Sequence, residues 1–197
     1  MIALWLGIGA FILYMFYDVN SIRWNRRFPR TFFMVGTVML AAAMVLDLCE
    51  AFRMDTIRCA GDALLLLTAG VSFAALIYSL FFALPFDETY QKQSAGRDVY
   101  DRGVYALCRH PGILFFFGMY LFAGLAALPE TGLILRGLLF SLLDLIYAWF
   151  QDRVTFPQTF SDYPDYRQRI PFLIPTKASL RLASQSLRHA GDEEVDP

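Results

Sequence analysis

The chain has 197 residues, of which 57% are hydrophobic, 16% aromatic and only 18% charged. A soluble domain averages about 45–50% apolar and about 25% charged residues, so this composition favours a membrane protein. The formal net charge of −1 offers no basic face for nucleic acid, and the three cysteines form neither a disulfide framework nor a zinc-binding spacing.

Five apolar stretches follow one another along the chain. They are Met1–Tyr17, Thr31–Leu48, Gly61–Leu84, Gly112–Leu128 and Thr131–Phe150. Each approaches or exceeds the roughly 17–25 residues that cross a bilayer core as a helix. The first stretch lacks the basic n-region and the cleavage site of a signal peptide, so we expect it to be retained. Backbone groups in lipid must be satisfied internally, and the sequence therefore predicts an all-α integral membrane bundle of about five transmembrane helices.

Two features inside these stretches have simple structural interpretations. Gly7 and Gly9 lie in an apolar span and are expected to allow close helix packing rather than to bind phosphate. Arg136 lies near the outer end of the fifth stretch, and we expect its side chain to extend outward to the lipid headgroups.

The basic residues predict how the bundle is oriented. Arginine and lysine gather in the loop over residues 18–30, in the loop over residues 85–111 and in the tail beyond Phe150. The loop on the opposite side holds only Arg53 and Arg58. By the positive-inside rule, the N-terminus faces outward and the C-terminus faces the cytoplasm. Cys49 and Cys59 share the external loop, and the spacing leaves a disulfide between them open.

The tail beyond the fifth stretch divides into two parts. Tyr163–Pro175 is aromatic, rich in arginine and interrupted by prolines, which predicts a structured cytoplasmic segment that is not helical throughout. Ser179–Ala190 can form a helix on the membrane surface, and "GDEEVDP" reads as a disordered acidic tail. We expect one membrane-embedded helical domain over residues 1–175, with the surface helix and tail over residues 176–197.

The first candidate site is the loop that ends in Tyr105, Arg109, His110 and Pro111. Pro111 disfavours a helical conformation at His110, so this pair predicts a fixed turn where the fourth span begins. The free N–H groups of the helix and the charge of Arg109 together suit a carboxylate or a phosphate. The structural alternative is that Arg109 extends to lipid headgroups while His110 only caps the span.

The second candidate site lies on the fifth span and its extension. Asp144, Tyr147, Ala148, Gln151 and Asp152 are spaced so that they share one helical face. An ionisable group inside a membrane normally faces a polar cavity or a partner, which makes Asp144 a functional candidate. The alternatives are a buried hydrogen bond from Asp144 to a neighbouring helix and a simply solvated Asp152.

A third group, Tyr163, Tyr166, Arg167 and Arg169, has the composition of interfacial anchors when each residue is taken alone. Together with the first group, however, it forms a longer pattern. "GVYALCRHPGILFFFGMYL" is followed about forty residues later by "FSDYPDYRQRIPFLIP". This combination resembles the isoprenylcysteine carboxyl methyltransferase and phospholipid methyltransferase superfamily over roughly residues 97–175. The matching positions are Gly103, Tyr105, Arg109, His110, Pro111, Phe160, Tyr163, Tyr166, Pro171 and Pro175.

The resemblance implies a membrane enzyme that binds S-adenosylmethionine at the cytoplasmic face and methylates a lipid-like or isoprenoid-modified acceptor. It implies that Arg109 suits the carboxylate of the cosubstrate and Asp152 its ribose diol or its ammonium group. The catalytic residues would be Arg109, His110 and Asp144, and no metal is expected. The cosubstrate-binding residues would be Tyr105, Arg109, His110, Pro111, Gln151, Asp152, Tyr163 and Tyr166.

The chain departs from the family pattern at three places, which leaves two other functions open. The Tyr-x-Gly that usually follows the R-H-P motif is replaced by Ile113-Leu114-Phe115, the acidic pair by Asp152-Arg153, and the glycine after Phe160 by Ser161. One alternative is an NADPH-dependent membrane reductase of the related sterol-reductase branch. The other is a non-catalytic member of the same fold that binds lipid or acts as a scaffold.

Overall fold

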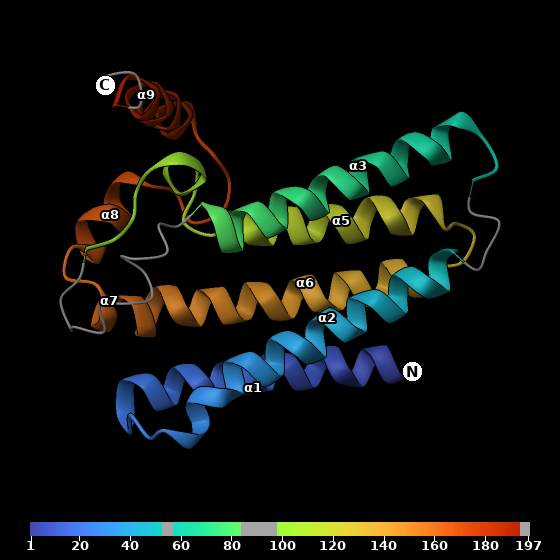
Figure 1. Ribbon diagram of the computed structural model, residues 1–197, viewed down its shortest axis with the longest axis horizontal. Coiled ribbons are helices and arrows are strands. Elements are labelled where there is room, and N and C mark those ends of the chain that lie inside the picture. Colours follow the sequence, from blue (N-terminus) through green and yellow to red (C-terminus); the bar gives the residue numbers. More distant parts are fainter. Residues whose placement is uncertain (53–56, 84–97, 194–197) are drawn as a thin grey trace. The chain divides into compact units, whose positions relative to one another are not determined.

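The computed structural model describes residues 1–52, 57–83 and 98–193 (Figure 1). Within these ranges every regular element is a helix, which confirms the predicted all-α class. Four helical segments are long and apolar enough to cross a membrane, in agreement with a membrane bundle. The described residues divide into two compact units, residues 1–73 with 116–155 and residues 74–115 with 156–197. The expectation of a single domain over residues 1–175 stays a prediction.

The helices follow the predicted apolar stretches closely. The candidate spans are α1 (Ile2–Arg23), α2 (Thr31–Phe52), α3 (Ala60–Ile77) with the π-helix η2 (Tyr78–Phe82), and α6 (Gly132–Phe150) with the π-helix η4 (Gln151–Thr155). The fourth predicted span is α5 (Pro111–Ala126), which has only 16 residues. Five predicted spans thus correspond to four long helices and one shorter apolar helix.

The end of α1 differs from the prediction, which placed it at Tyr17. The helix continues to Arg23 and ends where Asn25 adopts a left-handed conformation with φ 49°. The backbone N–H groups of Trp24 and Asn25 both donate to the Asn20 carbonyl oxygen, at 3.1 and 2.6 Å. This is the pattern of a helix cap with asparagine in the left-handed position. Asp18, expected in a loop, therefore belongs to the helix.

In the first unit, α1 packs against α2 and α6 (Figure 1). Small residues allow this close approach, as the sequence predicts for Gly7. A side chain at Gly7 would overlap the ring of Phe140, which is fully buried on α6. A side chain at Gly36 on α2 would meet the Tyr14 ring and the Ala10 carbonyl oxygen of α1.

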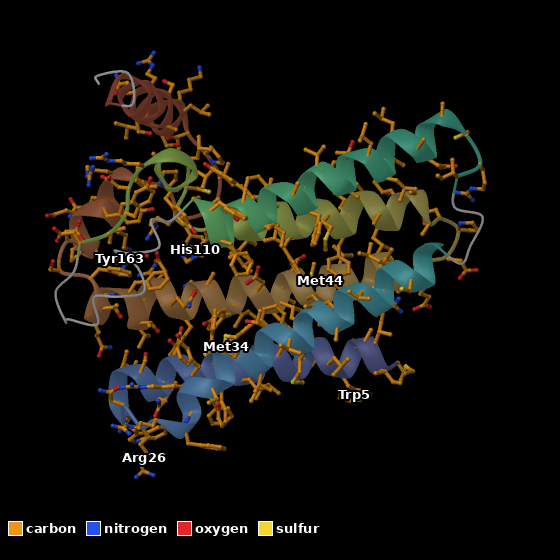
Figure 2. The ribbon with its side chains drawn as sticks, in the orientation of Figure 1. Trp5, Arg26, Met34, Met44, His110 and Tyr163 are labelled. Atoms are coloured by element: carbon orange, nitrogen blue, oxygen red, sulfur yellow. The ribbon has the colours of Figure 1, made fainter. Side chains whose placement is uncertain are left out.

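Large apolar side chains lie exposed on the outside of this unit. Trp5, Met34 and Val38 are each about two-thirds exposed (Figure 2). In water such a surface would favour aggregation, whereas acyl chains solvate it without cost. The exposed side chains therefore mark the surface of the first unit that faces lipid.

The second unit contains the end of the third span, the short helix η3 (Gly103–Ala106) and the start of α5. It also contains the C-terminal helices α7 (Phe156–Thr159), α8 (Tyr163–Arg169) and α9 (Lys177–Glu193). The core consists of Tyr163, Tyr166 and Ile170, with Val99, Phe156 and Phe160 packed against it.

The C-terminal segments of this unit follow the predicted division with one difference. α8 ends at Arg169, and Ile170 is extended (φ −108°, ψ 128°) because Pro171 follows it. The segment Tyr163–Pro175 is thus structured without being helical throughout, as predicted. The final helix is longer than the predicted Ser179–Ala190, since α9 runs to Glu193, and residues 194–197 lie outside the described part of the chain.

Candidate functional site

The first half of the family-like pattern, which begins at Gly103 and contains the R-H-P motif, is bonded to the last turn of the third span. Gly103 begins η3 with φ 58°, a conformation that glycine adopts without strain. Two residues later, the Tyr105 hydroxyl donates to the Ser79 carbonyl oxygen of η2 at 2.9 Å. This bond fixes the loop before the R-H-P motif against the span.

Hydrogen bonds join this loop to the second half of the pattern, within the same unit. The Tyr166 hydroxyl donates to the Tyr105 carbonyl oxygen at 2.8 Å, and the Arg109 backbone N–H donates to the Pro171 carbonyl oxygen at 3.0 Å. A further bond of 2.8 Å runs from the Val99 N–H to a carboxylate oxygen of Asp162. Segments about sixty residues apart thus form one structure, and residues of both halves of the pattern hold it together.

Aromatic rings surround Arg109 and His110. The His110 ring lies parallel to the Phe156 ring with centroids 5.8 Å apart, and it tilts against the Phe172 ring at 4.9 Å. The Arg109 guanidinium carbon lies 5.5 Å from the centroid of Phe172, within the range of a cation–π interaction. His110, labelled in Figure 2, is 9% exposed, whereas Arg109 is partly exposed. Arg109 can therefore present charge to a ligand while its orientation is limited by Phe172.

The neighbouring helix terminus adds to this positive charge. α5 begins at Pro111, which matches the predicted start of the fourth span. Proline at the first helical position costs no hydrogen bond, because that N–H would have no intrahelical partner. The Ile113 N–H donates to the His110 carbonyl oxygen at 3.3 Å, and the first turn of the helix carries partial positive charge next to Arg109. This arrangement suits a carboxylate.

Two weakly acidic side chains near the R-H-P motif, the Cys108 thiol and the Tyr166 hydroxyl, remain protonated near neutral pH. Burial raises the pKa of the Cys108 thiol to about 11, although a hydrogen bond from the His110 backbone lowers it slightly. Burial, followed by the nearby Tyr163 hydroxyl, raises the pKa of Tyr166 well above its ordinary value. Neither group can serve as a thiolate nucleophile or a phenolate base at neutral pH, so Tyr166 acts here as a hydrogen-bond donor.

A buried carboxylate that the sequence interpretation missed lies in the first unit. Asp18 is 3% exposed and accepts hydrogen bonds from Tyr147, Gln151 and Thr155, the last at 3.4 Å. The Gln151 amide also donates to the Tyr147 hydroxyl at 2.9 Å. The sequence did contain a signal, because Asp18 directly follows the apolar stretch Met1–Tyr17. An acid in that position indicates a buried polar contact only if the helix continues beyond the apolar stretch.

The predicted face of α6 is modified by a π-helix. Tyr147 and Gln151 do face each other, but η4 begins at Gln151 and the wider turn rotates the residues after it. Asp152 is 2% exposed, so the alternative of a solvated Asp152 is wrong. Asp144, also predicted here, has a partly exposed side chain and lies near Tyr14.

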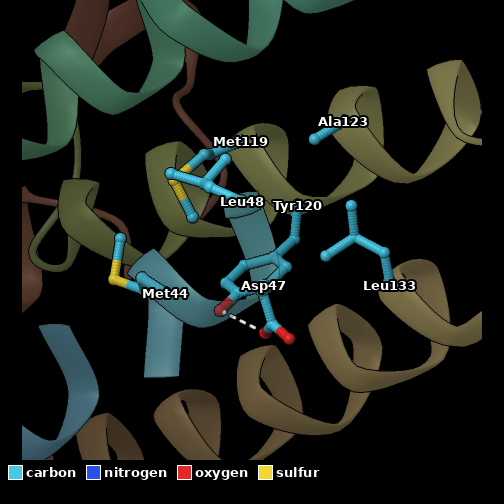
Figure 3. Close-up of a pocket in the computed structure, with 7 residues that line it drawn as sticks. All are labelled: Met44, Asp47, Leu48, Met119, Tyr120, Ala123 and Leu133. Carbon is cyan, nitrogen blue, oxygen red and sulfur yellow. Dashed lines mark hydrogen bonds between the residues drawn. The ribbon is translucent and has the colours of Figure 1, made fainter. Parts of the chain in front are cut away.

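The position of Arg136 corrects a further expectation. It does not extend outward: its Nε lies 2.7 Å from an oxygen of Asp47, and another guanidinium nitrogen lies 2.9 Å from Glu50. The second Asp47 oxygen accepts a hydrogen bond of 3.2 Å from the Tyr120 hydroxyl (Figure 3). Asp47 is 1% exposed, and the ion pair with it holds the Arg136 side chain against α2. Opposite charges in two apolar stretches were the signal that could have indicated this pair.

A small cavity adjoins this ion pair. Its volume is about 10 Å³, and it is lined by Met44, Asp47, Leu48, Met119, Tyr120, Ala123 and Leu133 (Figure 3). The space is too small for any ligand larger than a water molecule. The cluster therefore fits a structural role.

The predicted site residues are distributed over both units. Tyr105, Arg109, His110, Pro111, Tyr163 and Tyr166 belong to the second unit, and Asp144, Gln151 and Asp152 to the first. Tyr163 and Tyr166 are each 2% exposed and form the core of their unit. Comparisons with models of known families, with curated proteins and with solved structures gave no match for this chain.

Proposed function

We propose that this protein is a membrane-bound methyltransferase that uses S-adenosylmethionine to methylate a lipid-like acceptor. The observation that carries the proposal is the assembly of the two halves of the family-like pattern into one unit. The bonds from Tyr166 to Tyr105 and from Arg109 to Pro171 link them directly. A pattern whose separate parts meet in space is more informative than either part alone.

In this proposal Arg109 and His110 hold the cosubstrate. The partly exposed guanidinium of Arg109 lies next to the start of α5, where both charges favour the cosubstrate's carboxylate. The phenylalanine rings beside His110 exclude water from that side of the site. S-adenosylmethionine supplies a methyl group on a positively charged sulfur, and its transfer mainly requires alignment and exclusion of water.

The other predicted residues take different parts. Tyr105, Tyr163 and Tyr166 form the framework that positions Arg109, since their contacts are with backbone oxygens and core rings. Pro111 sets the start of α5. The cosubstrate contacts of Gln151 and Asp152, and a catalytic role of Asp144, remain predictions, because these residues belong to the first unit.

An acceptor with an apolar chain suits the surroundings of the site. Phe81 and Phe82, on the last turn of the third span, are 56% and 71% exposed in the same unit as Arg109. Such side chains face acyl chains in a bilayer, so an acceptor dissolved in lipid would encounter this unit by lateral diffusion.

The test is calorimetric titration of the detergent-purified protein with S-adenosylmethionine and, separately, with NADPH. We expect saturable binding of S-adenosylmethionine that is lost in Arg109→Ala and weakened at least tenfold in His110→Ala. Arg30→Ala is the matched control, because Arg30 is exposed in the first unit and its guanidinium donates a hydrogen bond to the Asn25 side chain.

The same titrations distinguish the alternatives. Binding of NADPH without S-adenosylmethionine would replace the proposal with a membrane reductase. The buried tyrosines favour a third possibility, in which the pattern only stabilises the fold. In that case neither cofactor binds, and Arg109→Ala lowers the thermal unfolding temperature without any change in ligand affinity.

A further inference from the structure

The C-terminal helix α9 attaches to the second unit through its small residues rather than its leucines. Ser179 is fully buried and Ala183 is 4% exposed, and α9 contacts η3 at this face. One turn further, the Ser186 hydroxyl accepts a hydrogen bond from the Gly103 N–H at 3.1 Å. These three positions follow the i, i+4, i+7 spacing of one helical stripe. The attachment therefore leaves Leu180, to one side of this stripe, uncovered.

The exposed side of α9 combines apolar and basic residues. Leu180 is 52% exposed, and Lys177, Arg181 and Ser184 are its exposed neighbours on the helix surface. Ile174, in the segment that leads into α9, is 76% exposed. A leucine bordered by cations three residues before it and one residue after it is typical of a helix at a membrane surface.

Contacts within the second unit place this helix at the end of a membrane span. η3, to which α9 attaches, is bonded through Tyr105 to Ser79 on the last turn of the third span. Phe81 and Phe82 on that turn are exposed as lipid-facing residues are. In Figure 1, α9 is strongly foreshortened whereas the last turn of the span, in the same unit, lies along the page, so the two helix axes differ in direction. A helix at the end of a span, with an axis that differs from that of the span, can lie along the membrane surface.

We propose that the exposed face of α9 binds the headgroup layer of an anionic bilayer. Ile174 and Leu180 enter the boundary between headgroups and acyl chains, and Lys177 and Arg181 bind lipid phosphates. Anionic lipid is the partner that complements these two cations, because its negative surface potential attracts basic residues next to a span. Two apolar side chains are a small surface for a protein partner but are sufficient to add to an existing membrane anchor.

The test uses the full chain in vesicles, with a fluorescent bimane label on the one introduced cysteine that is accessible to the reagent. Cys49 and Cys59 are exposed and are replaced by serine, whereas Cys108 is buried and remains. The label is placed at Leu180→Cys and, as a control on another side of the same helix, at Gln185→Cys. We expect nitroxide lipids to quench the label at position 180 severalfold more than at position 185, and aqueous iodide to show the opposite order.

Charge dependence provides the second measurement. Replacing phosphatidylglycerol by phosphatidylcholine should reduce lipid quenching at position 180. In the double variant Lys177→Gln with Arg181→Gln, quenching should be the same in both lipids. Equal iodide quenching at both positions would overturn the proposal. So would shielding of position 180 that depends on protein density in the vesicle, since a second copy of the chain would then cover the face. These readouts are independent of methyl transfer.

Discussion

Arg136, inside the fifth predicted span, is paired with acidic residues within the first unit. It forms ion pairs with Asp47 and Glu50, and Asp47 also accepts a hydrogen bond from the Tyr120 hydroxyl. A buried pair contributes little relative to an apolar substitute, but removing one partner leaves an uncompensated charge. The ion pair therefore makes α2 and α6 dependent on each other.

We expect Arg136→Met to lower the free energy of unfolding by roughly 3–5 kcal/mol, because Asp47 then keeps a buried charge without its partner. Unfolding in mixed micelles, titrated with a denaturing detergent, measures the difference. The double variant Asp47→Leu with Arg136→Met should recover most of the lost stability. A double variant as unstable as the sum of the two single variants would contradict this explanation.

The glycine at position 7 should be much more sensitive to substitution than an exposed helical glycine. Gly7→Ala forces Phe140 to move, and overpacking of this kind costs typically about 1–3 kcal/mol. Gly70→Ala is the matched control, because nothing lies within 4 Å of a side chain there. Thermal unfolding in detergent should therefore show destabilisation for Gly7→Ala and a neutral or slightly favourable effect for Gly70→Ala. Equal effects would mean that only helix propensity matters.

Among the elements, α6 and its π-helical continuation depend most on a residue distant in sequence. Asp18 on α1 accepts hydrogen bonds from Tyr147 on α6 and from Gln151 and Thr155 on η4. A π-turn widens the helix and is rare in proteins. We expect the buried carboxylate of Asp18 to stabilise η4 through these hydrogen bonds.

We expect Asp18→Ala to destabilise the protein by about 1–3 kcal/mol, since the donors of Tyr147, Gln151 and the buried Thr155 lose their acceptor. Asp18→Asn has nearly the same shape and retains one acceptor oxygen, so it should cost less. Hydrogen exchange of Gln151–Thr155 should accelerate in Asp18→Ala before the rest of α6 is affected. Unchanged exchange in this segment would show that η4 does not depend on Asp18.

The bounds of the helices could be predicted largely from hydrophobicity, whereas the π-helices could not. Apolar runs define where a helix enters and leaves lipid, and α2, α3 and α6 begin within one residue of the predicted stretches. The extension of α1 was missed because Asp18 and Asn20 are polar, and their burial depends on contacts with residues distant in sequence or beyond the helix end. No periodicity could predict the hydrogen bond between Tyr105 and Tyr166, which are about sixty residues apart, and the resemblance only assigned both to one cosubstrate site.

For the molecule as a whole, orientation remains a prediction from the basic loops, with the N-terminus outside. Cys49 and Cys59 are free and exposed in the structure, while Cys108 is buried. An impermeant maleimide added to intact cells should label the first two. Cys108 should react from neither side, because it is 1% exposed and its pKa is raised to about 11, which leaves little thiolate at neutral pH.

The control for this experiment is complete labelling of all three cysteines after denaturation. Labelling of Cys49 and Cys59 only after the membrane is made permeable would reverse the orientation. Rapid labelling of Cys108 in the native protein would contradict its burial.

The shortness of α5 has a consequence for the membrane in which the protein resides. At about 1.5 Å per residue its 16 residues span about 24 Å, less than a hydrocarbon core of roughly 30 Å. The longer helices can tilt to match the bilayer, but a short helix cannot lengthen, so either the bilayer thins beside α5 or the chain on both sides of it completes the crossing. Most of α5 is covered by protein, and Phe117 is its one exposed large apolar side chain, so acyl-chain length would act on α5 mainly through the chain at its two ends.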